Sequence, residues 1–503
     1  MKISDVTDSL WGNTARFSYL FLASILLLFT LLGGREIWTQ EHRWADIVSG
    51  MFYRHDFLHP YLGETDYYDK PLLSYWLIAL FAKLTNALTT WVLRLPSALA
   101  GLLAIWSIYR LGTALKDKQL GLLAGWLLLT TFYFVFWART SSADMLNLAG
   151  SLFAIAWYVD HRQRASFFEY SVFFIILALT SLCKGLAVVP LIAVITDVLL
   201  QKSWKQHLRL PLLLAAVPAL IIYLFPFWAS SYFDGGSYGE NGLYLVYREN
   251  FLRYFQPFDH QGPIYTYFLY LPIYLLPSAI FFIPALFTLK SRWRTMSVES
   301  KWIAWTLLLL FLFFTLSGSR RSYYVLPIVP FAILFTADWI LVKNFTFARR
   351  QVWSASLVIF SFILLFAAVD VMPAWYYSKF GVNRFADVLK NEASKTKPWD
   401  TWNVVMLDAE SKLNFYLQLS PNVQKYHIKG TQRNLQTADT LQKAWPILAN
   451  KPANTIFITR MLYASALQGY FVGYRTVKLP SQKSWLFMKK HDADAPIAFI
   501  PVQ

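Results

Sequence analysis

Long apolar runs alternate with short polar loops from residue 17 to residue 372. The runs 17–34, 119–138 and 265–289 contain no charged residue. About 20 such residues, at ~1.5 Å rise each, cross the ~30 Å hydrocarbon core of a bilayer. The pattern predicts a polytopic α-helical membrane protein. Its predicted spans are 17–36, 92–112, 119–138, 143–160, 167–183, 185–201, 210–229, 265–289, 302–318, 322–341 and 352–372.

Basic residues in the loops predict the orientation of these spans. Every second connection is rich in Lys and Arg, and by the positive-inside rule these connections face the cytoplasm. The N-terminus is therefore expected to be cytoplasmic and the C-terminus external. The basic residues of these connections are Lys116, Lys118, Arg162, Arg164, Lys202, Lys205, Arg209, Lys290, Arg292, Arg294, Lys301, Lys343, Arg349 and Arg350.

The segment 72–88 has the length of another span, but counting it as one would invert every later loop. Its leucines recur every three or four residues, which is typical of an amphipathic helix. We therefore expect this helix to lie in the external membrane interface. A second short helix is predicted over 45–53.

The composition changes near residue 374, where apolar runs shorten and polar residues become frequent. The chain is thus predicted to consist of a membrane domain, 1–373, and a soluble periplasmic α/β domain, 374–503. The first external loop, 37–91, holds the interfacial helices. Strands are predicted at 404–407, 455–459 and 485–488.

Composition agrees with a membrane protein and disfavours a nucleic-acid-binding one. Hydrophobic residues make up 56% of the 503 and charged residues 15%, whereas a soluble domain is about a quarter charged. The net charge of +17 is distributed over the loops between spans and does not form one basic stripe. The single cysteine, Cys183, excludes an intrachain disulfide framework.

Charged groups gather in the first external loop. Residues 40–71 follow the first span and contain six carboxylates and three histidines. Charge is costly near lipid, so it tends to be kept where it functions. The predicted topology places Asp144, Lys184 and the loop 230–264 in the same compartment. Carboxylates act as bases or metal ligands and fixed cations hold phosphate, so the set predicts chemistry on a lipid-linked phosphate.

Simpler explanations stay open for each of these residues. Lys and Arg at span ends commonly snorkel, Trp and Tyr commonly form interfacial belts, and a histidine in a loop is commonly solvated. His260 is the strongest metal candidate among the histidines because Asp259 precedes it. The few acidic residues within the spans disfavour a proton-coupled transporter, which needs buried relay carboxylates.

Several motifs resemble the GT-C membrane glycosyltransferases, in particular the bacterial aminoarabinose-lipid A transferases and protein O-mannosyltransferases. The resemblance covers about residues 15–375 and also includes Asp144 and His260. Its motifs are QEHRWADI at 40–47, YDKPLLSYW at 68–76, RLPSALAG at 94–101, TSLCKG at 180–185 and SRRSYYVLP at 319–327.

The resemblance implies a GT-C fold of about 11–13 transmembrane helices in a bacterial inner membrane and a polyprenyl-phosphate sugar as donor. It also implies a catalytic acid at the position of Gln40, and glutamine cannot accept a proton at neutral pH. Three explanations stay open. Glu41 or Asp46 takes the role, or the acceptor is a phosphate that needs no base, or the protein binds polyprenyl phosphate without catalysis.

The sequence therefore predicts transfer of a sugar to lipid A or a related envelope lipid or glycan. Protein O-glycosylation and non-catalytic binding of polyprenyl phosphate are the alternatives. The predicted catalytic residues are Gln40, Glu41, Asp46 and Asp144. The predicted substrate-binding residues are Arg43, Lys70, Arg139, Lys184, Arg253, Arg320, Arg321 and Tyr323. A divalent ion (Mg²⁺, Mn²⁺ or Zn²⁺) is expected at Asp69 and His260, and no nucleic-acid partner is expected.

Overall fold

The computed structural model describes residues 3–38, 40–62, 65–67, 70–233, 238–257, 260–344, 346–419, 425–426, 452–479 and 494–502. The chain divides into two compact units, which we call the helical unit and the C-terminal unit. The helical unit consists of Met1–Leu32, Asp56–Pro60 and Asp66–Val371. The C-terminal unit consists of Gly33–His55, Tyr61–Thr65 and Met372–Gln503.

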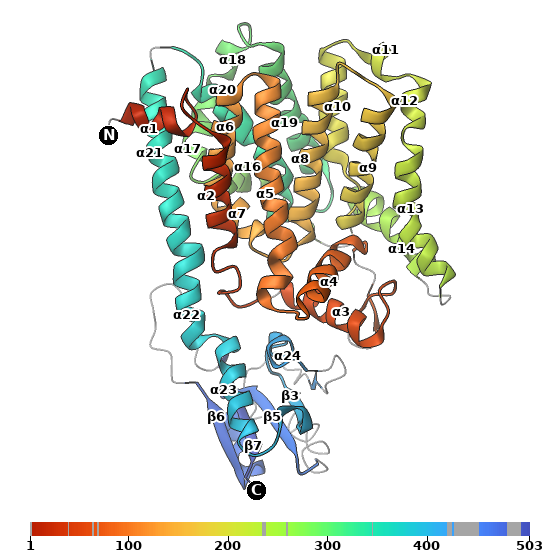
Figure 1. Cartoon of the computed structure of the whole chain (residues 1–503), viewed down its shortest axis with the longest axis vertical. Helices are drawn as coiled ribbons and strands as arrows, with labels where there is room; N and C mark the ends of the chain where they lie inside the picture. Colours follow the sequence, from red (N-terminus) through yellow and green to blue (C-terminus); the bar gives the residue numbers. More distant parts are fainter. Residues whose placement is uncertain are drawn as a thin grey trace. The chain divides into compact units, whose positions relative to one another are not determined.

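Helices build the helical unit (Figure 1). The first part contains α1 (Ile3–Leu10), α2 (Phe17–Phe29), α4 (Leu73–Thr85), α5 (Thr90–Leu115), α6 (Lys118–Leu129), α7 (Phe132–Ala138), α8 (Ala143–His161), α9 (Phe167–Cys183) and α10 (Val188–Leu200). Next come α11 (Trp204–His207), α12 (Leu210–Leu214), α13 (Val217–Tyr232), α14 (Tyr238–Tyr247), η1 (Arg248–Leu252) and α15 (Arg253–Phe255). The last part contains α16 (Thr266–Tyr274), α17 (Ala279–Phe287), α18 (Leu289–Arg292), α19 (Val298–Leu316), η2 (Ser322–Ile328), α20 (Val329–Ile340), α21 (Phe347–Leu365) and η3 (Phe366–Val371).

Each predicted span coincides with at least one apolar helix, which confirms the prediction of a mostly helical membrane protein. By length and composition, five helices within the described residues are sufficient to cross a membrane. They are Thr90–Leu115, Leu210–Tyr232, Val298–Leu316, Ser322–Ile340 and Phe347–Ser394. Shorter apolar helices are Phe17–Phe29, Leu73–Thr85, Phe167–Cys183 and Val188–Leu200. The number of 11 crossings stays a prediction.

The span predicted at 119–138 is broken. Helices α6 and α7 together are apolar enough to cross a membrane but meet at an angle of 73°. At the break the hydroxyl of Thr130 donates to the carbonyl of Trp126, and the hydroxyl of Thr131 donates to the carbonyl of Leu127, each at 2.8 Å. Such bonds to the preceding turn compete with the helical ladder and bend helices.

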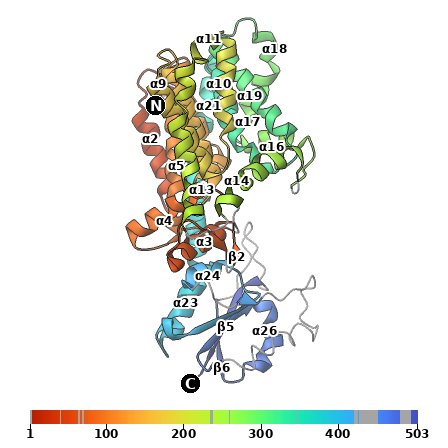
Figure 2. The same ribbon diagram turned by 90° about the vertical axis from the view of Figure 1, so that its right-hand side faces the viewer.

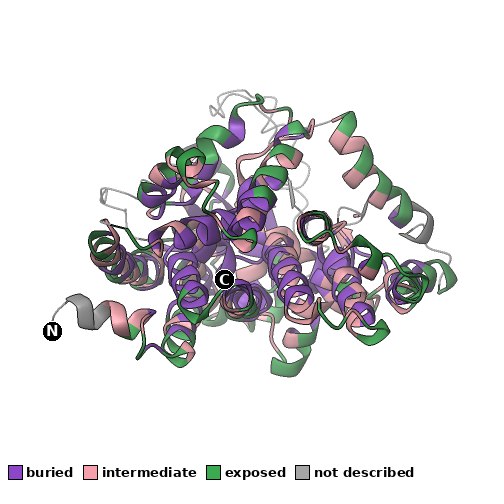
Figure 3. Ribbon diagram, turned by 90° about the horizontal axis from the view of Figure 1, so that it is seen from above, coloured by how far each residue is buried: buried purple, intermediate pink, exposed green. Residues whose placement is uncertain are grey.

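Small residues allow the helices to approach closely. A Cβ on Gly112 of α5 would lie 2.7 Å from the Cα of Gly121 of α6, and one on Gly150 of α8 would lie 2.2 Å from Thr180 Oγ1 of α9. Small residues at such contacts are typical of helix packing in membranes. Figure 3 shows buried residues where helices face one another and exposed residues on their outer sides. The exposed side of α13 is apolar and includes Leu220, Ile221, Phe225 and Trp228.

The C-terminal unit contains a five-stranded sheet in the order β4-β3-β5-β7-β6 (Figure 2). Strand β3 is parallel to β4 and β5, whereas β7 is antiparallel to β5 and β6. The strands are β3 (Asn403–Leu407), β4 (Lys425–Tyr426), β5 (Thr455–Arg460), β6 (Tyr474–Lys478) and β7 (Pro496–Pro501). The strands predicted at 404–407 and 455–459 are confirmed, and the one predicted at 485–488 lies outside the described residues.

Helices cover both faces of this sheet. Phe385 and Leu389 of α23 pack on the face that carries Ile456, and Leu467 of α26 packs on the face that carries Phe457. The helical elements after residue 371 are α22 (Met372–Phe380), α23 (Val382–Ser394), η4 (Trp399–Thr401), α24 (Lys412–Leu417), α26 (Met461–Leu467) and η5 (Gln468–Tyr470). The α/β character predicted for this region is therefore confirmed.

The loop 37–91, which is predicted to be external, contains the two predicted helices. The helix expected over 45–53 is α3 (Glu41–Arg54), and the one expected over 72–88 is α4. On α4, Ser74, Tyr75 and Ile78 are buried while Leu80 and Leu84 are 51% and 69% exposed, so this helix has one free apolar side. The short strands β1 (Tyr61–Leu62) and β2 (Thr65–Asp66) pair between the two helices. The structure groups α3 with the C-terminal unit.

Candidate active site

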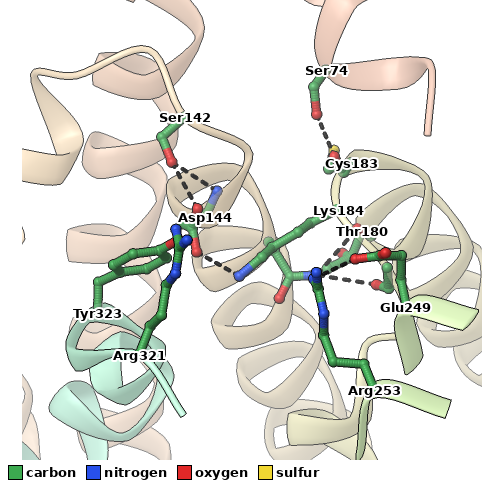
Figure 4. Close-up of polar contacts among 12 residues, drawn as sticks. Ser74, Ser142, Asp144, Thr180, Cys183, Lys184, Glu249, Arg253, Arg321 and Tyr323 are labelled. Atoms are coloured by element: carbon green, nitrogen blue, oxygen red, sulfur yellow. Dashed lines mark hydrogen bonds and ion pairs between the residues drawn. The ribbon is translucent and has the colours of Figure 1, made fainter. Parts of the chain in front are cut away.

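A carboxylate and an ammonium group form the centre of the candidate site in the helical unit. Lys184 Nζ lies 2.5 Å from Asp144 Oδ1 (Figure 4). Asp144 is the second residue of α8, and Lys184 directly follows the end of α9. The side chains are 17% and 27% exposed. A ligand can therefore reach a pair that is partly withdrawn from solvent.

The N-terminus of α8 fixes the orientation of Asp144. Ser142 is the N-cap, and its Oγ accepts the backbone N–H of Asp144 at 3.0 Å. The same hydroxyl donates to Asp144 Oδ2 at 3.0 Å. A carboxylate at the start of a helix is also favoured by the helix dipole. Asp144 is thus oriented by the start of its own helix as well as by the ion pair with Lys184.

The turn after α9 positions Lys184. The next residue, Gly185, has φ 156°, and a Cβ there would lie 3.0 Å from Asn250 Oδ1. That amide oxygen accepts the backbone N–H of Leu186 at 3.0 Å. Asn147 Nδ2 donates to the carbonyls of Thr180 and Gly185 at 3.3 and 3.4 Å. Two asparagines from other elements therefore hold the turn that carries the lysine.

Further cations surround this pair. Arg253 pairs with Glu249 one helical turn earlier, and Arg248 lies 3.2 Å from the same carboxylate. Arg321 Nη1 donates to the Tyr323 hydroxyl at 2.7 Å. Figure 4 shows Arg253 and Arg321 pointing into the region around Asp144 and Lys184.

The ring of Tyr324 lies near Lys184 and is influenced by the neighbouring charges. Lys184 Nζ is 5.1 Å from its centroid, and its hydroxyl is within electrostatic reach of Arg253, Asp144 and Arg321. Basic side chains outnumber carboxylates in this cluster. Such a cluster favours an anion, and arginine and lysine are the usual ligands of phosphate.

Two of the predicted substrate-binding arginines, Arg139 and Arg320, contact the protein framework. Arg139 is 5% exposed, lies 2.6 Å from Asp370 and donates to the carbonyls of Leu27 and Thr30 at 2.9 Å each. These carbonyls end α2, where a helix leaves acceptors unsatisfied.

Arg320 similarly donates to the carbonyls of Thr315 and Gly262, at 2.9 and 2.7 Å. Substrate contacts by Arg139 and Arg320 stay predictions. The hydrogen bonds of both guanidinium groups to backbone carbonyls show that these side chains also hold the protein framework.

The predicted catalytic segment begins α3 in the C-terminal unit. Gln40 is the N-cap, and its side chain makes no capping hydrogen bond. Glu41 is fully buried, and its Oε2 accepts the backbone N–H of Trp38 at 2.7 Å and lies 3.6 Å from Arg35. Arg43 and Asp46 are half-buried on the same helix. Glu41 thus fixes the turn into α3, while Gln40 and Asp46 retain solvent-accessible surface.

The predicted metal site at Asp69 and His260 can be compared with the structure only at His260. Asp69 lies outside the described residues. The backbone carbonyl of His260 accepts the N–H of Arg320 at 2.7 Å, and His260 itself has φ 58°. Within the described ranges, no three His, Cys, Asp or Glu side chains gather in a metal-binding group. The divalent ion therefore stays a prediction, and we derive no step through it.

Several residues of the cluster were not predicted as site residues. Ser142 and Glu249 orient charged groups, and Tyr324 contributes a ring to the centre. The sequence does carry signals for two of them, because Ser142 precedes the first turn of a helix and Glu249 stands four residues before Arg253. Lys70 is half-buried and follows the undescribed residues 68–69.

Comparison with known proteins agrees with this fold. The family model described as dolichyl-phosphate-mannose-protein mannosyltransferase matches residues 69–229. An uncharacterised protein of Aquifex aeolicus is 26% identical over 384 residues, which are 74% of this chain and 71% of that protein. The undecaprenyl phosphate-α-4-amino-4-deoxy-L-arabinose arabinosyl transferase of Pectobacterium atrosepticum is 25% identical over 334 residues. That match spans 63% of this chain and 58% of the transferase.

Solved structures show the same architecture over nearly the whole chain. ArnT from Cupriavidus metallidurans, crystallised with undecaprenyl phosphate, matches with a TM-score of 0.68 at 15% identity, over 96% of this chain and 97% of that one. The oligosaccharyltransferase AglB from Archaeoglobus fulgidus, in complex with an inhibitory peptide and a dolichol-phosphate, matches with a TM-score of 0.51 at 13% identity. This second match covers 90% of this chain and 70% of AglB.

The chain has the GT-C fold of ArnT. The family model and the relatives support a membrane glycosyltransferase of the type that includes the aminoarabinose transferases and the protein mannosyltransferases. The resemblance inferred from the motifs is thereby confirmed.

Proposed function

We propose that this protein transfers a sugar from a polyprenyl-phosphate donor to an acceptor in the bacterial envelope. The observation that carries the proposal is the Asp144–Lys184 pair with Arg253 and Arg321 around it. When the bond from sugar to phosphate breaks, negative charge grows on the departing polyprenyl phosphate. Fixed cations stabilise that charge without reorganising, which is a large term in many enzymes.

The related proteins support this donor. ArnT was crystallised with undecaprenyl phosphate and AglB with a dolichol-phosphate. The arabinosyl transferase relative is named for an undecaprenyl phosphate-linked sugar. The apolar surface of the helical unit suits the isoprenoid chain of such a donor, because the chain can stay in the bilayer while its phosphate meets the cations.

As acceptor we propose lipid A or a related envelope lipid, reached from the periplasmic side of the inner membrane. In this orientation the N-terminus is cytoplasmic and residues 374–503 are periplasmic, as the loop charges predict. Protein acceptors are the second candidate, favoured by the family model that matches residues 69–229.

Gln40 supports a phosphate as the acceptor group. Glu41 is fully buried and bound within its own turn, which disfavours it as the base. A lipid phosphate is already anionic, so it needs positioning but no deprotonation. Gln40 can donate a hydrogen bond to such an oxygen.

The test is transfer from a radiolabelled polyprenyl-phosphate sugar pool in membranes that contain the wild type or Lys184→Met. Lys395→Met is the matched control, because Lys395 pairs with Glu392 and is 64% exposed. We expect label in lipid A with the wild type and the control, and a loss of about 10²- to 10³-fold with Lys184→Met. Label in protein would favour the second candidate. Polyprenyl phosphate binding without transfer to any acceptor would show a non-catalytic protein.

A further inference from the structure

The segment that leads from α2 into α3 is held at Glu36 and Ile37 by residues of 372–503, the part of the C-terminal unit that we call the C-terminal domain. Glu36 Oε1 lies 2.8 Å from Lys412 Nζ, and Glu36 Oε2 accepts the backbone N–H of Val382 at 2.9 Å. The two charged side chains are 10% and 19% exposed. A pair this far from solvent has a defined geometry, and losing one partner leaves a buried charge.

Lys412 keeps its charge in this setting. It also lies 2.8 Å from Glu410. Burial lowers the pKa of Lys412, but the carboxylates of Glu36 and Glu410 outweigh burial, so its pKa lies above the usual value. The two carboxylates thus favour the charged form of Lys412.

The next residues are held as well. The backbone N–H of Ile37 donates to the Tyr416 hydroxyl at 2.7 Å, and the N–H of Trp38 donates to Glu41 at 2.7 Å. Lys412 and Tyr416 stand four residues apart in α24, so they share one face of that helix. One helix face of the C-terminal domain thus binds two successive residues of the loop, and Gln40 follows three positions later.

We propose that α24 of the C-terminal domain positions the start of α3 for catalysis, with Glu36, Lys412 and Tyr416 as positioning residues. The proposal rests on the proposed glycosyltransferase function and assigns the C-terminal domain a part in it. Gln40 and Asp46 belong to the helix that this anchor fixes. A displacement of about 1 Å at a reacting group can cost about 10²-fold in rate.

Positioning and simple domain docking differ in their kinetic effect. A group that aligns Gln40 in the transition state lowers kcat and leaves donor binding unchanged. A contact that merely stabilises the fold lowers the amount of active protein and leaves kcat and KM of the folded fraction unchanged.

The experiment uses the full-length protein in lipid vesicles with Glu36→Gln, Tyr416→Phe, Lys412→Met and Lys412→Arg. Tyr416→Phe removes one hydroxyl and Glu36→Gln keeps an acceptor for Val382, so both are expected to fold even if Lys412→Met does not. Lys395→Met, in the exposed pair with Glu392, is the control from the same domain. We measure kcat and KM for a polyprenyl-phosphate sugar, and amide hydrogen exchange in peptides covering 33–55.

We expect kcat to fall about 10- to 100-fold in Glu36→Gln and Lys412→Met and a few-fold in Tyr416→Phe, with KM unchanged. Lys412→Arg should restore most of kcat. Exchange at 36–41 should rise in every variant with lowered kcat and stay unchanged in Lys395→Met. Unchanged kcat with faster exchange would overturn the proposal, and so would unchanged exchange in Glu36→Gln and Tyr416→Phe. If no donor supports transfer, hydrogen exchange still tests the contacts of Glu36, Lys412 and Tyr416 with the loop. Unaltered exchange in the variants then rejects these contacts as an anchor. Faster exchange supports the anchor, and the lack of transfer rejects the proposed transferase function.

Discussion

Lys184 Nζ lies 2.5 Å from Asp144 Oδ1, although Asp144 lies at the start of α8, Lys184 follows the end of α9, and the two stand 40 positions apart. Asp144 is itself oriented by the N-cap Ser142. The arrangement fixes the direction of the lysine, and Arg253 and Arg321 add further positive charge to the same region. A phosphate approaching this cluster meets cations that are already placed.

The first prediction concerns the two members of this pair. Lys184→Met should lower kcat about 10²- to 10³-fold because it removes a cation that stabilises the negative charge of the leaving phosphate. Asp144→Asn should lower kcat by a smaller factor, because the lysine loses its orientation. In the double variant the effects should not add, since both act through the same ammonium group. Steady-state transfer kinetics of the three variants check this, and full additivity would show that the two residues act separately.

The second prediction concerns Arg139 and Asp370, which lie deep in the helical unit. Arg139→Met leaves a buried carboxylate and two helix carbonyls without their donor, so it should destabilise the protein by about 3–5 kcal/mol. Thermal unfolding in detergent measures the loss. Arg110→Met is the control, because Arg110 pairs with Asp160 and is 43% exposed, and it should cost less than about 1 kcal/mol. Equal losses in both variants would contradict the structural role of Arg139.

The third prediction concerns the loop that begins α3. Glu41→Gln should lower the free energy of unfolding by about 1–3 kcal/mol, because the buried carboxylate loses its charge opposite Arg35. The folded fraction should retain transfer. Gln40→Asp should lower transfer, because it sets a negative charge beside an acceptor phosphate. A large increase in transfer would instead show that a general base is missing, and loss of transfer in folded Glu41→Gln would make Glu41 that base.

The fourth prediction concerns pH and His207, in the loop helix α11. Burial lowers the pKa of His207, an effect stronger than the opposing charge of Asp197. Its Nδ1 lies 2.5 Å from the Tyr170 hydroxyl. Because the folded protein disfavours the protonated ring, this histidine reduces stability as pH falls below the unfolded pKa of about 6.5. The unfolding temperature of the wild type should therefore decrease from pH 8 to pH 5 more steeply than that of His207→Gln. Parallel curves would contradict this.

Helix positions could be predicted from the sequence because a bilayer requires each backbone polar group to bond within its own segment. The span predicted at 167–183 coincides with α9, and the amphipathic pattern at 72–88 located α4. The break between α6 and α7 escaped prediction, since its cause is a pair of threonine hydroxyls in an otherwise apolar run.

The site was harder to predict than the fold. Loop charges placed Asp144 and Lys184 in one compartment, and that topological argument brought both into the candidate set. Arg139 was predicted to bind phosphate from its place at a span end, and the sequence carried no sign of its hydrogen bonds to the carbonyls at the end of α2. The contact between Glu36 and Lys412 joins residues 376 positions apart and depends on tertiary packing alone.

The most direct test of the account is a product balance with purified protein in lipid vesicles. Free polyprenyl phosphate and transferred sugar are measured together for the wild type, Lys184→Met and Lys395→Met. We predict that one polyprenyl phosphate is released for each sugar transferred, and that both products are lost together in Lys184→Met and unchanged in Lys395→Met. Sugar transfer without release of polyprenyl phosphate, or wild-type yields from Lys184→Met, would contradict it.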